Sequence, residues 1–153
     1  MKKPIRQRAQ RRLDERLTAL KPEDRFKTPP KGWMRAVRDA LGMTGPQFAR
    51  RLGVSPQNVA ALEKSEAIGT IQLNTLRRAA EELGCTLVYA LVPKTSLEDL
   101  VRERAHAIAR RDLERVAHTM KLEAQETGNA DLAERIEAYI RDVLKDRDLW
   151  NEP

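Results

Sequence analysis

The sequence has little that would support a zinc protein, a secreted protein or a membrane protein. One cysteine, Cys85, and two histidines among 153 residues can form neither an internal disulfide nor a four-ligand zinc site. No apolar run approaches the roughly 20 residues that cross a bilayer. Residues 1–4 lead into charged sequence, which predicts no secretory signal. These absences favour a reducing cytoplasm and predict neither metal nor cofactor.

Aromatic residues make up only 4% of the chain, too few for a large sheet sandwich, and charged residues make up 34%. The charge is uneven: residues 1–31 carry a net +7, residues 32–93 a net +2 and residues 94–153 a net −3. We predict these three ranges as the units of the chain. A basic N-terminal range and a mildly acidic C-terminal range favour two different partners, although a run of charged residues is often only a solvated face.

The first range predicts an amphipathic helix followed by an extended linker. Its apolar positions recur every three or four residues, at Ile5, Ala9, Leu13, Leu17 and Leu20. Pro22 ends the helix, and residues 22–31 read as linker. The helix could be a basic arm that crosses DNA, or it could pack on the body of the protein. The regular stripe favours packing.

The second range predicts four short helices and then one strand, so the expected fold class is mainly α. Thr44 and Ser55 are expected to cap the second and third helices, and Gly53 supplies the turn between them. Cys85 follows the glycine that ends the fourth helix and is expected to be buried.

The predicted strand covers residues 86–92, which are rich in strand-forming side chains. A lone strand leaves its backbone groups unpaired, and the chain offers no second good strand. We therefore predict an antiparallel ribbon between two copies of the chain, which makes a homodimer. Its dimerisation residues are Leu87, Val88, Tyr89, Ala90 and Leu91.

The third range predicts two helices in a hairpin, over about 96–126 and 129–144. Ser96-x-x-Asp99 resembles a capping box at the start of the first helix. This charged hairpin is the predicted surface for a protein partner.

The second and third helices have the spacing of a helix-turn-helix, in which the later helix enters the major groove. Gln57 and Asn58 can each pair at two points with adenine, and Ala61 can contact a thymine methyl group. Open backbone N–H groups at the start of the second helix can bind phosphate. The predicted DNA-binding residues are Thr44, Gly45, Gln47, Ser55, Pro56, Gln57, Asn58, Ala61 and Lys64. Simple capping and a solvated polar face are the alternatives.

Residues 32–83 resemble the helix-turn-helix of Cro/C1-type (XRE) repressors. Several runs resemble the mobile mystery protein A family more closely, namely Pro30–Trp33, Arg38–Met43, Leu62–Ala67, Gly84–Pro93 and Met120–Gln125. The resemblance implies a cytoplasmic, bacterial antitoxin and operator-binding repressor that associates with the nucleoid through its operator. Its implied partner is a Fic-domain toxin, mobile mystery protein B, which transfers AMP to protein hydroxyls.

The resemblance also assigns roles to single residues. Arg38 and Glu63 match an Arg–Glu pair that ties two helices together in XRE folds. Gly45 stands where many XRE repressors have a glutamine that contacts phosphate, so Gln47 or the backbone must serve instead. Known Fic inhibitors present Ser/Thr-x-x-x-Glu-Gly/Asn; Thr119 and Glu123 match this pattern, but Ala124 does not.

The sequence gives no evidence for an enzyme. His106 and His118 are twelve residues apart on one predicted helix, about 18 Å, which is too far for them to cooperate. The function predicted first is therefore a dimeric antitoxin that binds DNA. The alternative is a free-standing XRE-type repressor whose C-terminal helices only extend the dimer, and an enzyme is the third and weakest.

Overall fold

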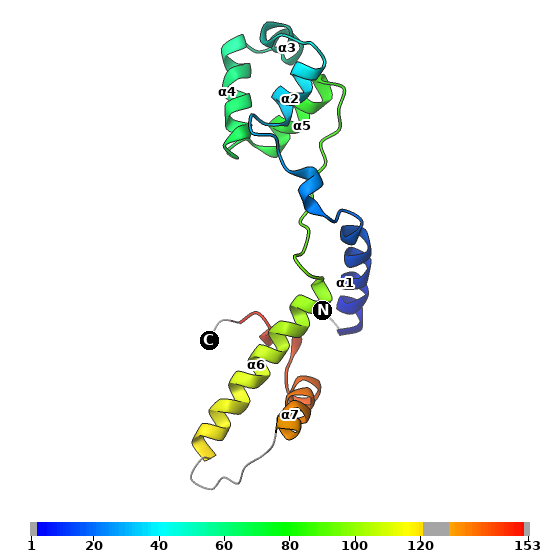
Figure 1. The fold of residues 1–153 in the computed structure, drawn as a ribbon, viewed down its shortest axis with the longest axis vertical. Helices are drawn as coiled ribbons and strands as arrows, with labels where there is room; N and C mark the ends of the chain where they lie inside the picture. Colours follow the sequence, from blue (N-terminus) through cyan, green and yellow to red (C-terminus); the bar gives the residue numbers. More distant parts are fainter. Residues whose placement is uncertain (1–2, 121–128, 152–153) are drawn as a thin grey trace. The chain divides into compact units, whose positions relative to one another are not determined.

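The computed structural model describes residues 3–120 and 129–151, which are helical except for turns and linkers (Figure 1). The α-helices are α1 (Lys3–Thr18), α2 (Trp33–Ala40), α3 (Gly45–Leu52), α4 (Pro56–Ala67), α5 (Leu73–Glu82), α6 (Leu97–Met120) and α7 (Asn129–Asp142). Two short 3₁₀ turns, Glu23–Phe26 and Asp146–Asp148, complete the described elements. No described helix is long and apolar enough to cross a membrane.

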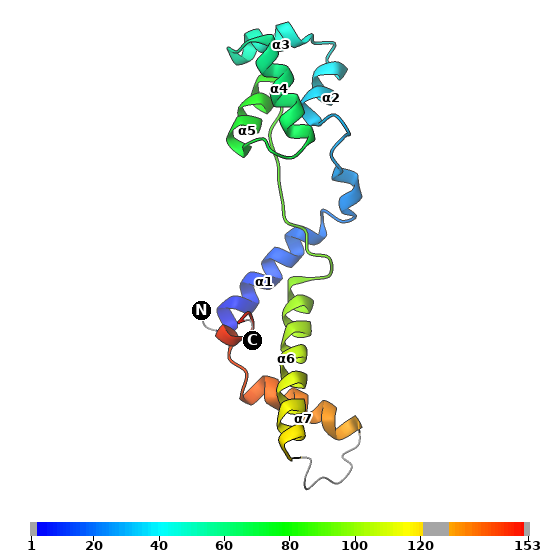
Figure 2. The same cartoon turned by 90° about the vertical axis from the view of Figure 1, so that its left-hand side faces the viewer.

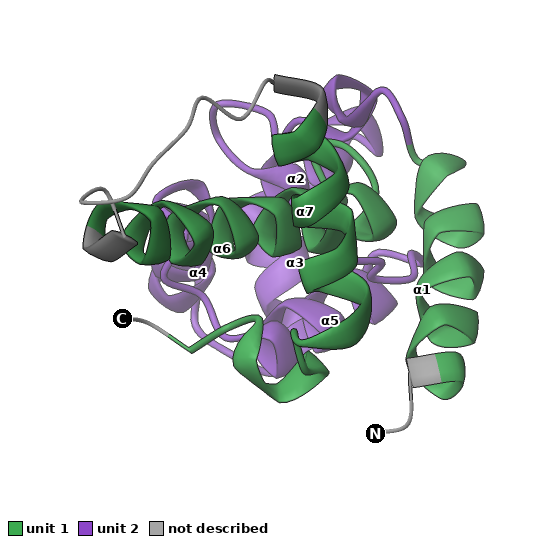
Figure 3. Ribbon diagram, turned by 90° about the horizontal axis from the view of Figure 1, so that it is seen from below, with its two compact units in different colours: residues 1–20, 92–153 green, residues 21–91 purple. Residues whose placement is uncertain are grey.

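Contacts divide the chain into two compact units (Figure 3). One comprises residues 21–91, with α2 to α5, and the other comprises residues 1–20 and 92–153, with α1, α6 and α7. This division places α1 with the C-terminal helices, whereas the sequence led us to treat residues 1–31 as a separate range.

The core of the unit 21–91 is small and apolar. Its buried side chains are Met34, Phe48, Ala49, Leu52, Val59, Ala79 and Leu83, drawn from α2 to α5 and the residue that follows α5. Phe48 is completely buried at the centre. Trp33 begins α2 and Leu41 follows its last residue, and the two are 44% and 57% exposed.

The start of α2 is capped by a residue from a distant helix. Glu66 of α4 accepts hydrogen bonds from the backbone N–H groups of Trp33 (2.8 Å) and Met34 (2.9 Å). Its carboxylate, only 8% exposed as a residue, thus satisfies two N–H groups that α2 itself cannot pair. Because Glu66 is 32 residues beyond Met34 in sequence, no local capping pattern reveals this contact.

Gly32 permits this close approach of the carboxylate. Its φ is +84°, and a Cβ atom built there would lie 2.6 Å from Glu66 Oε2 and 2.9 Å from Cδ. We predict that Gly32→Ala destabilises the protein by more than the roughly 1–3 kcal/mol that its backbone conformation, φ +84° and ψ 163°, costs a non-glycine residue. Gly42→Ala is the control for a positive φ without a close contact, since Gly42 has φ +67° and open space around its Cβ position. Urea unfolding that gives equal losses for the two variants would contradict the role of the Glu66 contact.

The unit that contains α1, α6 and α7 has a second, smaller core. Ala105, Ile108 and Leu149 are buried there, with Val101, Ile140 and Leu144 packed against them. Arg104 holds the C-terminal segment by donating from Nε to the carbonyl of Leu149 (2.8 Å). Tyr139 donates to Asp112 Oδ2 at 2.8 Å, and this bond raises the pKa of Tyr139.

Helix α1 packs on α6, but through a face that the sequence pattern indicated only in part. The half-buried positions are Arg6, Gln10, Asp14 and Leu17, whereas Ile5 and Leu13 of the predicted stripe are 54% and 44% exposed. Asp14 accepts the N–H groups of Leu97 (2.7 Å) and Glu98 (3.2 Å) and so caps α6. The predicted packing is present, but of the predicted stripe only Leu17 and Leu20 are half-buried, because capping by Asp14 and the ion pair of Arg6 select a mostly polar face.

The predicted strand at residues 86–92 is not seen, and no strand occurs among the residues that the structure describes. A strand is defined by hydrogen bonds to a neighbour, and a single copy of the chain supplies none for this segment. Three of its side chains are strongly exposed: Val88 (78%), Tyr89 (66%) and Leu91 (88%). Cys85, predicted to be buried, is also exposed, because the chain leaves α5 immediately before it.

Candidate nucleic-acid interface

Helices α3 and α4 meet at a three-residue turn, as seen in the upper part of Figure 2. Gly53 ends α3 in the left-handed conformation, with φ +67° and ψ +35°. The N–H of Val54 donates to the carbonyl of Ala49 at 3.0 Å, which closes the end of the helix. Ser55 then starts α4. The glycine and the serine therefore set the geometry of the helix pair, as predicted from the sequence.

The start of α3 is a full capping box. Thr44 Oγ1 accepts the N–H of Gln47 at 3.3 Å, and Gln47 Oε1 accepts the N–H of Thr44 at 2.8 Å. Gly45 and Pro46 form the first turn. The side-chain oxygen of Gln47 is thus occupied, and its NH₂ group is left to donate to a phosphate.

Helix α4 carries the residues predicted to read bases. Ser55 Oγ accepts the N–H of Asn58 at 3.2 Å, and Pro56 occupies the first turn. Val59, 2% exposed, fixes the inward face of the helix. The outward face presents exposed residues at Gln57, Asn58, Ala61 and Lys64, with Ala60 added by the structure. The Gln57 and Asn58 side chains form no hydrogen bond with other described residues, so their amides are available to base edges.

A buried ion pair holds α4 in place on its core-facing side. Arg38 of α2 donates from Nε to Glu63 Oε1 at 2.6 Å and from Nη2 to Oε2 at 3.3 Å. A third bond runs from Nη1 to the carbonyl of Met43 at 2.8 Å. The hydrogen bond to Glu63 raises the pKa of Arg38, so the guanidinium stays charged. The pair holds α2, α4 and the loop before α3 together, and neither residue is available to DNA.

The structure adds two arginines beside the start of α3 that the sequence analysis did not select. Arg50 and Arg51 line a shallow hollow with Gly42, Met43 and Gln47. Arg51 donates to the carbonyl of Glu82 at 2.9 Å, whereas Arg50 is exposed and forms no ion pair with a described residue. A free arginine near the open N–H of Gly45 suits a phosphate, because Pro46 has no N–H and the N–H of Gln47 is bonded to Thr44. Its position on the second turn of a helix that the sequence predicts could have indicated this role.

The comparisons with known proteins identify this unit. A family model described as helix-turn-helix matches residues 34–89. Residues 34–89 are an XRE-type helix-turn-helix domain. Such a domain indicates sequence-specific binding of double-stranded DNA and regulation of transcription. No curated protein and no solved structure matches the chain.

The remaining predicted site residues lie outside this domain's DNA-facing side. Thr119 is in the last turn of α6, and Glu123 lies outside the described residues. His106 is next to Glu137, with Nε2 and Oε1 3.2 Å apart, and His118 is exposed farther along α6. Among the residues that the structure describes, no group of His, Cys, Asp and Glu could hold a metal ion.

Proposed function

We propose that the protein is a homodimeric operator-binding repressor, with Gln57 and Asn58 as its main base-reading residues. The observation that carries the proposal is the outward face of α4, where both amides are exposed near the helix start and are free of other contacts. Residues at this position of the second helix reach base edges in helix-turn-helix proteins. Arg50, the Gln47 NH₂ group and the N–H of Gly45 at the start of α3 provide the phosphate contacts beside it.

The dimer is proposed from the segment that follows the domain. Val88, Tyr89 and Leu91 are large, exposed side chains, and their backbone has unpaired hydrogen-bonding groups. Pairing this segment with its copy about a two-fold axis would satisfy those groups and cover the side chains. A two-fold protein also matches a palindromic operator, with half-sites about 10 bp or a multiple apart.

Val88→Pro is expected to dissociate this dimer. Proline removes one backbone donor and fixes φ near −65°, and both changes oppose a central ribbon position. Sedimentation velocity measures the result, and Val88→Thr, which keeps the N–H group and the strand preference, is the control. If the Val88→Pro protein sediments as an intact dimer, the ribbon is not the dimer interface.

We further propose that the same chain is an antitoxin, with residues 94–153 contacting a Fic-domain toxin. This part of the proposal rests on the family resemblance and on the net −3 charge of that range. A Fic gene beside this one in the genome is the first test. The second is co-expression, in which Glu123→Gly should release AMP transfer by the toxin while operator binding is unchanged.

Two other outcomes of these experiments would favour a different function for residues 94–153. If Glu123→Gly still silences the toxin, then inhibition uses another surface. If no Fic gene is adjacent, the free-standing repressor is favoured, and the C-terminal helices then serve the dimer alone.

A further inference from the structure

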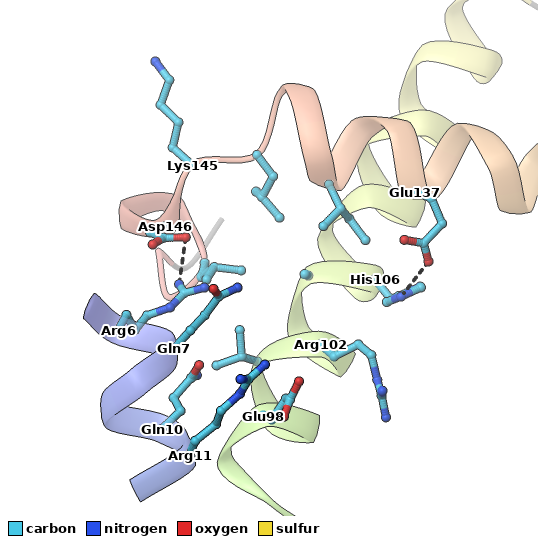
Figure 4. A pocket seen from close by; sticks show the side chains of 15 residues that line it. Arg6, Gln7, Gln10, Arg11, Glu98, Arg102, His106, Glu137, Lys145 and Asp146 are labelled. Carbon is cyan, nitrogen blue, oxygen red and sulfur yellow. Dashed lines mark ion pairs between the residues drawn. The ribbon is translucent and has the colours of Figure 1, made fainter. Parts of the chain in front are cut away.

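A pocket of about 230 Å³ lies between α1, α6, α7 and the segment that follows α7 (Figure 4). All of its walls belong to the unit of residues 1–20 and 92–153, and none of them is used in the proposed DNA contacts. Its floor is apolar and is made by Val101, Ala105, Ile140 and Leu144. Pockets for drug-sized ligands are typically about 300–1,000 Å³, so this one fits a smaller molecule.

Charges of both signs surround this apolar floor, and several are already paired. Arg6 Nη1 is 2.8 Å from Asp146 Oδ1, and His106 Nε2 is 3.2 Å from Glu137 Oε1. Figure 4 shows both pairs at the pocket wall. Arg6 and Asp146 offset each other's charge, and His106 and Glu137 lie side by side at the wall.

Three charged side chains at the pocket, Arg11, Lys145 and Glu98, have no ion-pair partner among the described residues, and Figure 4 shows Lys145 pointing away from the pocket. Arg11 comes from α1 and Glu98 from α6, and the two are not paired with each other. The side chains of Gln7 and Gln10 also line the pocket without a hydrogen-bond partner in the described chain. In addition, the Nε atom of Arg6 is buried and unbonded, which is a costly state for a charged donor.

We propose that this pocket binds a small zwitterion with an apolar body, of the class of an apolar α-amino acid. Arg11, with the Gln10 amide beside it, binds the carboxylate, and Glu98 binds the ammonium group. The apolar side chain of the ligand lies on the floor formed by Val101, Ala105, Ile140 and Leu144. A plain anion would meet the repulsion of Glu98, and a plain cation that of Arg11, so both charges of the ligand are needed. This inference does not depend on the proposed DNA binding.

The test is calorimetric titration of the full chain with L-leucine and two analogues that each lack one charged group. 4-Methylpentanoate lacks the ammonium group, and isoamylamine lacks the carboxylate. Leucine is expected to bind saturably at one site, and each analogue is expected to bind at least about tenfold more weakly. Failure of leucine, valine, methionine and phenylalanine alike to bind would overturn the proposal, as would an analogue that binds as well as leucine.

Two variants test which charged group of the ligand Arg11 and Glu98 each bind. Glu98→Gln should remove the preference for leucine over 4-methylpentanoate, and Arg11→Gln should remove the preference over isoamylamine. Arg8→Gln is the matched control, because Arg8 is an exposed arginine of α1 that does not line the pocket. Circular dichroism checks that each variant is folded. If Arg8→Gln weakens leucine binding as much as Arg11→Gln does, binding reflects the general charge of α1 and the assigned pocket is wrong.

Discussion

Replacing Arg38 by methionine is expected to lower the free energy of unfolding by about 3–5 kcal/mol, the usual cost of removing one partner of a buried ion pair. The side chains of Arg38 and Glu63 are 11% and 9% exposed, so Glu63 would be left nearly without water or counter-charge. The carbonyl of Met43 would lose its donor as well. A domain with a core this small can lose most of its stability in this way.

Matched variants separate the loss of the pair from the loss of packing. Arg38→Met/Glu63→Leu removes both charges and should recover much of the stability, because no buried charge is left alone. Arg35→Met is the control for losing an arginine of α2, since its ion pair with Asp39 is exposed and is worth little. Chemical unfolding followed by circular dichroism gives all the values. A loss below about 1 kcal/mol for Arg38→Met would show that the pair is not structural.

A second large expected effect is the decrease of operator affinity with rising salt concentration. If a dimer contacts about 6–10 phosphates, raising the salt from 50 to 200 mM should weaken operator binding by roughly 10³–10⁵-fold. The proposed contacts are the Gln47 NH₂ group, Arg50 and the N–H of Gly45 at the start of α3. Arg50→Gln should reduce the slope of log affinity against log salt by about one for each protomer, with no change in the preferred sequence. Fluorescence anisotropy over a salt series measures both quantities. A slope unchanged in Arg50→Gln would remove Arg50 from the phosphate contacts.

The helices of the DNA-binding domain could be predicted from the sequence because their ends are encoded locally. Thr44 and Ser55 cap α3 and α4, and Gly53 ends α3 at a positive φ that disfavours other residues. The exposed positions of α4 follow from the same helical period, since Val59 must face the core. Local signals therefore located both the fold and the candidate reading face.

Long-range polar contacts could not be predicted in the same way. Glu66 caps α2, and Asp14 caps α6 from 83 residues away. Neither residue is close in sequence to the helix that it caps. The contact at Asp14 and the ion pair of Arg6 also decide which face of α1 is covered. Apolar periodicity predicted only the C-terminal part of this face, Leu17 and Leu20, because polar contacts determine the orientation of the rest of the helix.

The strand was predicted from β-forming side chains, but it requires a partner that composition does not supply. Residues 86–92 therefore have no strand pairing in a single copy. Whether two copies pair there is a property of the assembly, and the sedimentation experiment on Val88→Pro addresses it directly.

In the proposed function, α4 reads the operator through Gln57 and Asn58. This role is tested most directly by selecting preferred sites from a random DNA library with the native chain and with Gln57→Ala/Asn58→Ala, at one salt concentration. The native chain should select a palindrome, and each substitution should cost on the order of 1–3 kcal/mol of discrimination at its own base position. The double variant should keep its non-specific affinity, because the phosphate contacts are intact. If the double variant selects the same palindrome with undiminished preference, the reading surface is elsewhere and the account of this interface is wrong.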